Sequence, residues 1–156
     1  MKEDSDEGIL QICTSFYQDL YSSQNINDND IDCYLEDISV QNILTETEKE
    51  KCEGKIITKE CLNALNQMKR NKSPGMDGII IEFYQQFWDL LKDLLIDMFN
   101  ECYDLGSLPD SMRTAIISLI FKKGDQENLD NYRPISLTNT DYRILAFTLA
   151  ERIQQV

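Results

Sequence analysis

Apolar residues recur at three- and four-residue spacing in three parts of the chain, which is the pattern of helices that bury one face. The three series run through residues 9–21, 80–105 and 140–153, and the second is the strongest. Each stripe needs a partner surface. The stripes are Ile9, Ile12, Cys13, Phe16, Tyr17, Leu20 and Tyr21; then Phe83, Phe87, Leu91, Leu94, Leu95, Met98 and Cys102; then Tyr142, Leu145, Leu149 and Ile153.

Helix-capping signals predict two shorter helices between the first two series. Thr45 followed by Glu48 is a capping-box pattern, which predicts a helix over 46–53 that ends near Gly54. Thr58 is expected to cap a second helix, which ends in the basic stretch 69–72. Gly106 is expected to close the long helix, and Asn139 or Thr140 to cap the last one.

The period changes after residue 113. Residues 114–121 are rich in isoleucine without a helical stripe, which predicts a strand covered on both faces, and 132–137 predict a second strand. Their short separation favours antiparallel pairing, with 122–131 as the exposed loop. The predicted fold class is α+β, mostly helical with one short antiparallel strand pair.

Two polar segments divide the chain. Residues 24–32 are rich in Asn and Asp and show no periodicity, so we expect a mobile linker there. Residues 73–78 are dense in turn formers, among which Gly75 and Gly78 allow positive φ. We therefore predict an acidic helical arm with its linker over 1–60 and a second domain over 61–156.

The net charge of −13 argues against a nucleic-acid partner, but the charge is uneven. Residues 1–60 hold 15 acidic and 5 basic residues, whereas residues 112–156 hold 5 acidic and 6 basic ones. The acidity thus belongs mostly to the amino-terminal arm. Only the last third has a charge balance that suits phosphate groups.

The amino-acid composition argues against several kinds of catalytic and metal-binding site. Histidine is absent, which excludes the usual triads and imidazole metal ligands. The five cysteines are scattered and include no C-x-x-C pair, so free thiols in a reducing compartment are expected. The acidic amino terminus and the lack of a long apolar run predict an intracellular protein, cytoplasmic or nuclear, with no membrane partner.

Three stretches in order resemble reverse transcriptases of the LINE (non-LTR retrotransposon) type. They are Asn71-Lys72-Ser73-Pro74-Gly75-Met76-Asp77-Gly78 with Glu82-Phe83-Tyr84 and Phe87-Trp88; Leu108-Pro109 through Phe121-Lys122-Lys123-Gly124; and Asn131-Tyr132-Arg133-Pro134-Ile135-Ser136-Leu137 with Asn139 to Leu145. The resemblance implies that 61–156 are the fingers of an RNA-directed DNA polymerase. It also implies an RNA template and a DNA primer as partners of the intact enzyme.

The palm that carries the catalytic aspartates of this family has no counterpart in these residues. Polymerisation uses two magnesium ions held by those aspartates. We therefore expect this chain to hold no catalytic residue, metal site or cofactor. By itself it is expected to bind nucleic acid weakly and to be inactive. Whether it belongs to an active enzyme stays open. The family also has proline where Phe121 stands, which leaves the local strand ending open.

The resemblance implies that Lys122 or Lys123, together with Arg133, binds the triphosphate of the incoming deoxynucleotide. Lysine offers a point charge and arginine a planar fork for phosphate oxygens. Pro134 favours an extended backbone at Arg133. The alternative is that the paired lysines form a solvated turn.

Lys69, Arg70 and Lys72 are weaker candidates for contacts with the template backbone. They could equally stabilise the dipole of the preceding helix. Asp77 is interpreted as a turn residue instead of a metal ligand, because no second carboxylate lies at ligand spacing. Phe83 and Phe87 are interpreted as core residues instead of a base-stacking platform. The competing functions are an acidic interaction module with a protein partner for residues 9–21, and a decayed retrotransposon reading frame.

Overall fold

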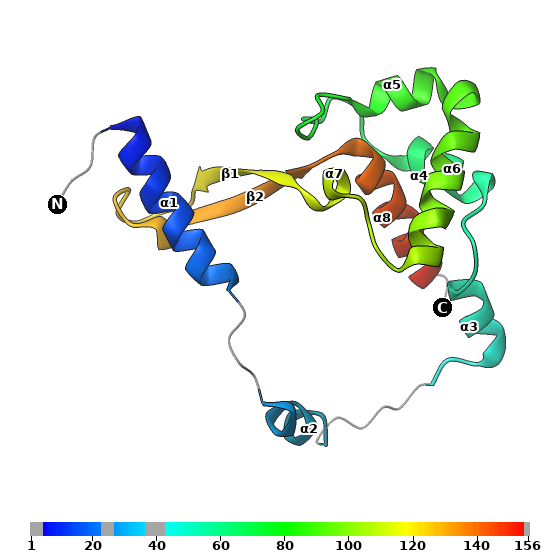
Figure 1. Cartoon of the computed structure of the whole chain (residues 1–156), viewed down its shortest axis with the longest axis horizontal. Coiled ribbons are helices and arrows are strands. Elements are labelled where there is room, and N and C mark those ends of the chain that lie inside the picture. The colour runs from blue at the N-terminus through cyan, green and yellow to red at the C-terminus, as the bar shows by residue number, and fades with distance from the viewer. Residues whose placement is uncertain (1–4, 23–26, 37–42, 155–156) are drawn as a thin grey trace. The chain divides into compact units, whose positions relative to one another are not determined.

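The structure is a computed structural model that describes residues 5–22, 27–36 and 43–154 (Figure 1). The described chain is mostly helical, with one two-stranded sheet. Its elements are α1 (Asp6–Tyr21), α2 (Asp28–Glu36), α3 (Glu46–Cys52), α4 (Thr58–Gln67), α5 (Ile81–Gln86), α6 (Trp88–Leu105), α7 (Asp110–Arg113), β1 (Ala115–Phe121), a 3-10 turn (Leu129–Asn131), β2 (Tyr132–Thr138) and α8 (Thr140–Ile153). The predicted fold class is confirmed.

The contacts divide the chain into two compact units. The hairpin-tip unit holds the described residues of 1–43 together with 121–133, and the helical unit holds 44–120 together with 134–156. This division differs from a simple boundary at residue 60, because the distal part of the strand pair groups with the amino-terminal segment. The predicted domains 1–60 and 61–156 remain a prediction.

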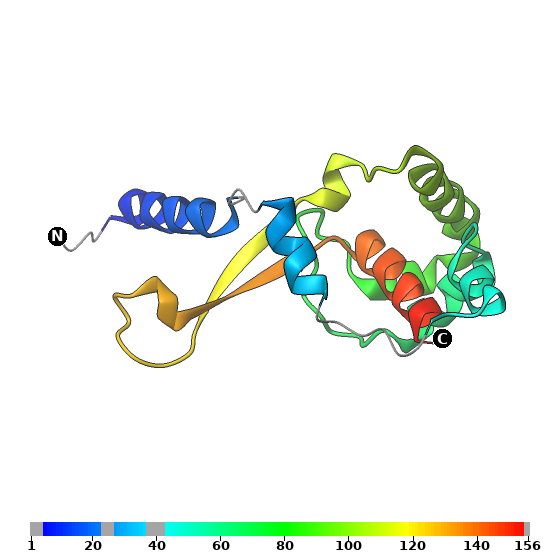
Figure 2. The same ribbon diagram turned by 90° about the horizontal axis from the view of Figure 1, so that it is seen from below.

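The core of the helical unit lies among α4, α5, α6 and α8. Helix α8 packs chiefly against α4, and Figure 2 shows these two helices side by side. Phe99 of α6 and Met112 of α7 are among the largest fully buried side chains. The buried core residues are Ile56, Cys61, Leu65, Ile81, Tyr84, Trp88, Leu95, Phe99, Met112, Ile144 and Leu145.

The capping signals are confirmed at α3 and corrected at α4. The Thr45 amide donates to Glu48 Oε2 at 2.7 Å, and Thr45 Oγ1 accepts from the Glu48 amide at 3.4 Å, which completes the capping box. Helix α4 is capped by Ile57, not Thr58, and the Ile57 amide donates to Glu60 Oε2 at 3.1 Å. This helix ends at Gln67, so residues 69–72 lie beyond it.

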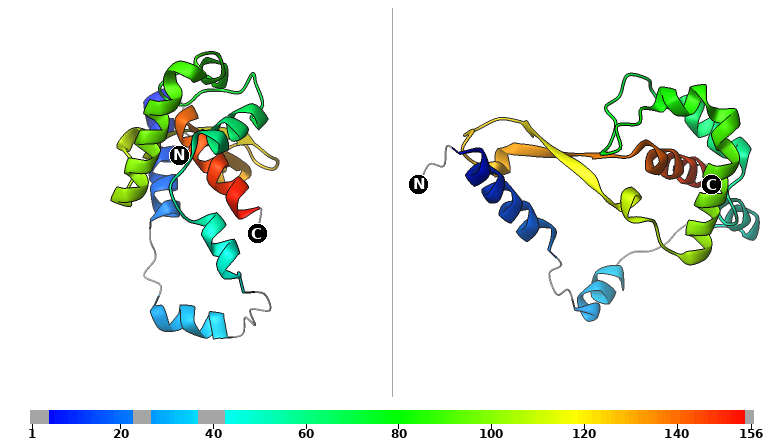
Figure 3. Two further views of the ribbon diagram at one scale, coloured as in Figure 1. Left: turned by 90° about the vertical axis from the view of Figure 1, so that its right-hand side faces the viewer. Right: turned by 45° about the horizontal axis from the view of Figure 1, so that its top comes forward.

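The long helix predicted over 80–105 is broken at Phe87, whose φ of −106° and ψ of 19° separate α5 from α6. Figure 3 shows the two helices running in different directions. Phe83 and Phe87 are 41% and 43% exposed, so their assignment to the core is wrong. Because of the break, the residues buried in this region are Ile81, Tyr84 and Trp88. Gly106, with φ of 63°, closes α6 as predicted.

The strand pair is confirmed as antiparallel, but the predicted covering of both faces of the first strand is wrong. Ile116, Ile117 and Ile120 are exposed. Among the described elements, only β2 pairs with β1, and a two-stranded ribbon without packed layers leaves such side chains in contact with solvent.

Two further predictions need correction. Residues 28–32 belong to helix α2, not to a linker, while 24–26 lie outside the described residues. Helix α8 begins after Asn139 as predicted, but Leu149 and Ile153 are exposed. No described helix has the length and apolar character needed to span a bilayer.

Candidate functional site

The hairpin tip carries the residues assigned to nucleotide phosphates. The Lys122 amide donates to the Asn131 carbonyl at 2.8 Å, which extends the pairing one residue beyond β1. The rings of Phe121 and Tyr132 lie 5.4 Å apart in an edge-on arrangement. Phe121 is the last residue of β1, and its ring contacts that of Tyr132 at the start of β2.

The two lysines differ in their relation to the ribbon. Successive side chains of a strand point to opposite faces, and directly opposed residues share a face. Since Lys122 opposes Asn131, Lys122 falls on the face of Arg133, whereas Lys123 lies in the bend beyond the paired residues. All three cationic residues are exposed, and none forms an ion pair with a described residue.

The turn between the strands is ordered by its own hydrogen bonds. Asn131 Nδ2 donates to the Asp125 carbonyl at 2.9 Å, and the Tyr132 hydroxyl donates to the Gln126 carbonyl at 3.0 Å. Gly124 has φ of 100°, which favours glycine there. The backbone that carries Lys122 and Lys123 is thus held in place.

The charge of this tip is balanced. Asp125, Glu127 and Asp130 lie in the same turn as the two lysines and offset the positive charge of residues 122–133. Burial raises the pKa of Tyr17 on α1, and the nearby charges of Tyr21, Cys13 and Asp130 raise it further. The tip therefore carries no net charge over residues 122–133, and these residues do not form an extended positive surface.

Lys69, Arg70 and Lys72 lie in the helical unit, in the segment that follows α4. Arg70 Nε donates to Gln85 Oε1 at 2.7 Å, and the Asn71 amide donates to Glu82 Oε1 at 2.6 Å. The bond from Asn71 lowers the pKa of Glu82. Lys69 and Lys72 are exposed. The structure therefore places the six predicted contact residues in two sets, one in each unit.

Gly75 and Asn139 form a close contact that the sequence did not reveal. An added Cβ on Gly75 would lie 2.2 Å from Asn139 Oδ1 and 2.6 Å from the Thr138 carbonyl carbon. Gly78 uses the positive φ that glycine allows, at 71°, whereas the φ of Gly75 is not positive. Gly75 is required for close packing, not for a left-handed backbone.

Asn139 joins three segments through its side chain. Its Nδ2 donates to the Ser111 carbonyl at 3.1 Å, and its Oδ1 accepts from the Asp77 amide at 3.4 Å. The Asp77 carboxylate accepts from the Ile79 amide at 3.0 Å, which agrees with its interpretation as a turn residue. The sequence signal for Asn139 was its place before α8, which suggested a helix cap and nothing more.

Burial perturbs two titratable groups beside this turn. It raises the pKa of Asp141, and the charge of Asp77 adds to this effect. It also raises the pKa of Tyr84 to about 12, with contributions from the charges of Asp141 and Asp77. In the described ranges, no three Asp, Glu, Cys or His side chains gather as a metal site would require.

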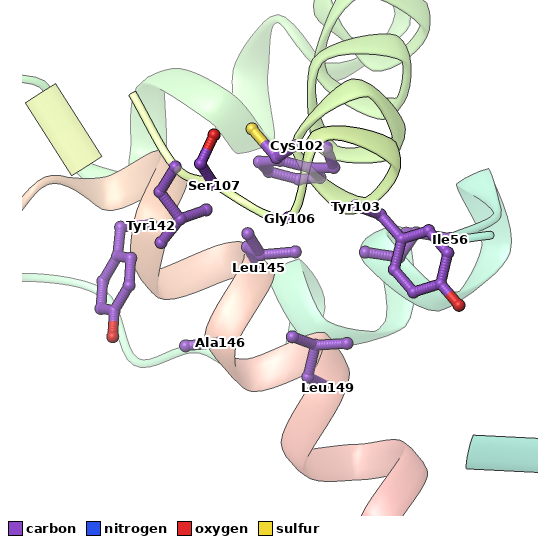
Figure 4. A pocket seen from close by; sticks show the side chains of 11 residues that line it. Ile56, Cys102, Tyr103, Gly106, Ser107, Tyr142, Leu145, Ala146 and Leu149 are labelled. Atoms are coloured by element: carbon purple, nitrogen blue, oxygen red, sulfur yellow. The ribbon is translucent and has the colours of Figure 1, made fainter. Parts of the chain in front are cut away.

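A cavity of about 370 Å³ opens between the end of α6 and the face of α8 (Figure 4). Its lining is mainly apolar, with Leu145 and Leu149 on α8 and Cys102 and Tyr103 on α6. Such a lining supplies hydrophobic contact but no set of converging polar groups. We assign no chemistry to it.

No protein-family model matches the sequence. The chain is 39% identical over 150 residues, 96% of its length, to the "Transposon TX1 uncharacterized 149 kDa protein" of Xenopus laevis. It is 26% identical over 98 residues to the "Retrovirus-related Pol polyprotein from type-1 retrotransposable element R1" of Bradysia coprophila. A "Putative 115 kDa protein in type-1 retrotransposable element R1DM" of Drosophila melanogaster is 25% identical over 92 residues. The chain spans only 11%, 10% and 9% of these relatives.

Proposed function

We propose that this chain, a region related to non-LTR retrotransposon proteins, forms the fingers of an RNA-directed DNA polymerase and holds the triphosphate of the incoming deoxynucleotide. In this proposal, the hairpin tip makes the phosphate contacts. The observation that carries the proposal is the placement of Lys122 and Arg133 on one face of the ribbon, both exposed and neither engaged in an ion pair in the described structure.

The two side chains suit different parts of a triphosphate. A lysine ammonium contacts phosphate as a compact charge, whereas an arginine guanidinium can bind two phosphate oxygens in one plane. Lys122 and Arg133 come from neighbouring strands, and the turn between them is fixed by the bonds of Asn131 and Tyr132. Such preorganisation lowers the entropic cost of binding. Lys123, in the adjacent bend, contributes longer-range attraction.

Lys69, Arg70 and Lys72 are proposed to contact the backbone of the RNA template. Arg70 is held by Gln85, whose Nε2 donates in turn to the Leu65 carbonyl at 3.0 Å. Because these residues lie beyond α4, stabilisation of the dipole of that helix does not explain them well. Contacts of this kind position nucleic acid without reading its sequence.

The proposed role is positioning, not bond formation. The two magnesium ions of the family's reaction need a cluster of carboxylates, and the described residues offer no such cluster. We therefore assign no catalytic step to this chain and propose that it is inactive alone.

The proposal is tested by photo-crosslinking the intact chain with dATP that carries an aryl azide on its γ-phosphate. Crosslinks are expected within residues 121–133, and unlabelled dATP should compete whereas deoxyadenosine should not. Lys122→Ala with Arg133→Ala should reduce labelling about tenfold, because two charge-assisted contacts are lost. The control is Lys59→Ala with Arg113→Ala, which removes an exposed lysine and an exposed arginine that pairs with Asp110, both outside the tip. Equal competition by deoxyadenosine, or unchanged labelling of the double variant, would contradict the proposal.

A second candidate function is a protein-interaction module that uses α1. Ile9, Leu10, Ile12 and Leu20 are exposed on this helix, whereas Tyr17 is its one buried residue. Such an apolar surface suits a protein partner. Binding of a protein that is lost on Leu10→Ser with Leu20→Ser, together with failure of the nucleotide crosslink, would favour this function.

A further inference from the structure

Four exposed apolar side chains form a continuous stripe across α5 and α6. Leu90 and Leu94 are 80% and 71% exposed, and Phe83 and Phe87 precede them at helical spacing. The rings of Phe83 and Phe87 lie 5.0 Å apart. We call Phe83, Phe87, Leu90 and Leu94 the outer stripe.

The break between the two helices does not interrupt this stripe. The amides of Leu90 and Leu91 both donate to the Phe87 carbonyl, at 3.0 and 3.1 Å, so Phe87 sits directly under the first turn of α6. Residues three and four apart on a helix are surface neighbours, which places Phe87 beside Leu90 and Leu90 beside Leu94. The outer stripe is therefore one surface built on two rigid elements.

The helical unit does not use this surface for its own core. Ile81, Tyr84, Trp88, Leu95 and Phe99 of the same helices are buried. Single exposed apolar residues are normal on protein surfaces, but a contiguous row of them indicates a surface that another molecule covers. The outer stripe meets this description.

Acidic residues adjoin the stripe along α6. Asp93 and Asp97 are exposed and lie one turn from Leu90 and Leu94 on the same helix face. Neither forms an ion pair with a residue that the structure describes, in contrast to Asp89, which binds Lys92 at 3.2 Å. The surface is thus apolar toward the start of α6 and negatively charged further along it.

This charge pattern selects the kind of partner. Carboxylates repel the phosphates of a nucleic acid, and two copies of the same acidic face repel each other. Lysine or arginine on a partner would complement Asp93 and Asp97. An apolar row on a helix is contacted most fully by side chains spaced three and four residues apart on a second helix.

We propose that the outer stripe docks an amphipathic helix of a protein partner, with apolar side chains against Phe83, Phe87, Leu90 and Leu94 and basic side chains against Asp93 and Asp97. The partner contributes the apolar contact area, and the charges fix its direction along α6. This inference is independent of nucleotide binding by the hairpin tip.

The test is selection of binders for the intact chain from a phage-displayed library of 16-residue amphipathic helices with randomised surface positions. Lysine- and arginine-rich peptides are expected, with affinity measured by fluorescence anisotropy. Leu90→Ser with Leu94→Ser should weaken binding about tenfold or more, because central apolar contacts dominate such interfaces. Asp93→Asn with Asp97→Asn should weaken it by a factor of about 3 to 10 and reduce its salt dependence.

Matched controls use residues of the same type and exposure elsewhere. Leu35→Ser with Leu44→Ser changes two exposed leucines outside α1, α5 and α6, and Glu50→Gln with Glu53→Gln removes two exposed charges. Both should leave the affinity within about twofold, because surface changes away from a contact have small effects. All substituted residues are exposed, and circular dichroism checks that the variants fold.

Four outcomes would overturn the proposal. They are the recovery of no peptide that depends on Leu90 and Leu94, a preference for acidic peptides, binding of a 20-nucleotide RNA that is lost in the leucine variant, and a dimer in sedimentation equilibrium that this variant converts to monomer. The last two outcomes would identify nucleic acid or a second copy of the chain as the occupant.

Discussion

Gly75 and Gly78 lie in one turn, yet different constraints require glycine at each position. Gly78→Ala is expected to cost about 1 kcal/mol, because φ of 71° is a left-handed conformation and no atom lies near the added methyl group. Gly75→Ala is expected to cost about 3 kcal/mol, because the methyl group would overlap Asn139 and the backbone at Thr138. Urea unfolding of the two variants measures the difference.

A third substitution, at Asn139, tests whether the contact with Gly75 causes this difference. Asn139→Ala removes the side-chain atom nearest to the added methyl group, so it should recover part of the loss in Gly75→Ala and none of the loss in Gly78→Ala. A double-mutant cycle detects this coupling. Equal losses in both glycine variants, with no coupling to Asn139, would show that the contact with Asn139 is unimportant.

Arg152 also forms hydrogen bonds to residues that are distant from it in the sequence. Its side chain is 8% exposed and binds Glu60 Oε2 at 2.8 Å, the Gly54 carbonyl at 2.8 Å and the Lys55 carbonyl at 2.8 Å. Arg152→Ala should cost about 3 kcal/mol, because Glu60 and two carbonyls lose their partner. Lys55→Ala, which breaks an exposed pair with Asp104, should cost less than about 1 kcal/mol in the same unfolding assay.

The Glu60–Arg152 pair also predicts a pH dependence. The hydrogen bonds from Arg152 lower the pKa of Glu60 below its usual value. The folded state then binds fewer protons than the unfolded state, so the stabilisation is present above the unfolded pKa, about 4.3, and is lost as the pH falls through the folded pKa. Unfolding free energies measured from pH 6 to pH 3 should therefore decline more in the wild type than in Glu60→Gln. Parallel curves would exclude this contribution.

At the scale of elements, α1 depends on a single anchoring residue. Tyr17 is the one buried side chain of this helix, its ring lies 5.1 Å from that of Phe16, and the charge of Asp130 helps to raise its pKa. Tyr17→Ala should release α1 from the hairpin-tip unit, because an isolated helix of this length is marginal in water. Hydrogen exchange should then speed up in residues 6–21 and stay unchanged in α4 and α8. Tyr17→Phe, which keeps the ring, should preserve protection.

At the scale of the whole molecule, net charge limits nucleic-acid binding. The chain carries −13, and the acids of the hairpin tip offset its bases, so binding to single-stranded RNA should be weak and salt-sensitive. If three cationic residues contact phosphates, a plot of the logarithm of the association constant against the logarithm of the salt concentration should have a slope of about −2. Anisotropy titrations at several salt concentrations measure this. Tight binding at physiological salt that survives Lys122→Ala with Arg133→Ala would contradict the proposed site.

The isolated chain is also expected not to extend a primer on an RNA template with any divalent ion. The hairpin tip positions phosphate, and Asp125 and Asp130 belong to a turn that offers no cluster of ligands for two metal ions. A primer-extension assay with radiolabelled deoxynucleotides measures this. Extension that is abolished by Asp125→Ala or Asp130→Ala would overturn the assignment of a positioning role alone.

Features that depend on a few neighbouring residues were predictable from the sequence. The capping box of Thr45 and Glu48, the closure of α6 at Gly106 and the two strands joined by residues 122–131 were all predicted. Each is fixed by bonds or dihedral angles within a few positions, so local sequence is sufficient. The candidate cations at 122, 123 and 133 were identified by resemblance, and their functional role remains a prediction.

Sequence patterns did not predict which faces are buried and which distant groups meet, because both depend on tertiary packing. The break at Phe87 exposed residues that the periodicity had assigned to the core, and the pairing of Lys122 with Asn131 placed this lysine on the face of Arg133. The contacts of Gly75 with Asn139 and of Glu60 with Arg152 join residues more than 60 positions apart. Such contacts depend on how helices pack around a shared core, and a pattern of spacing within one segment carries no information about the partner that another segment will supply.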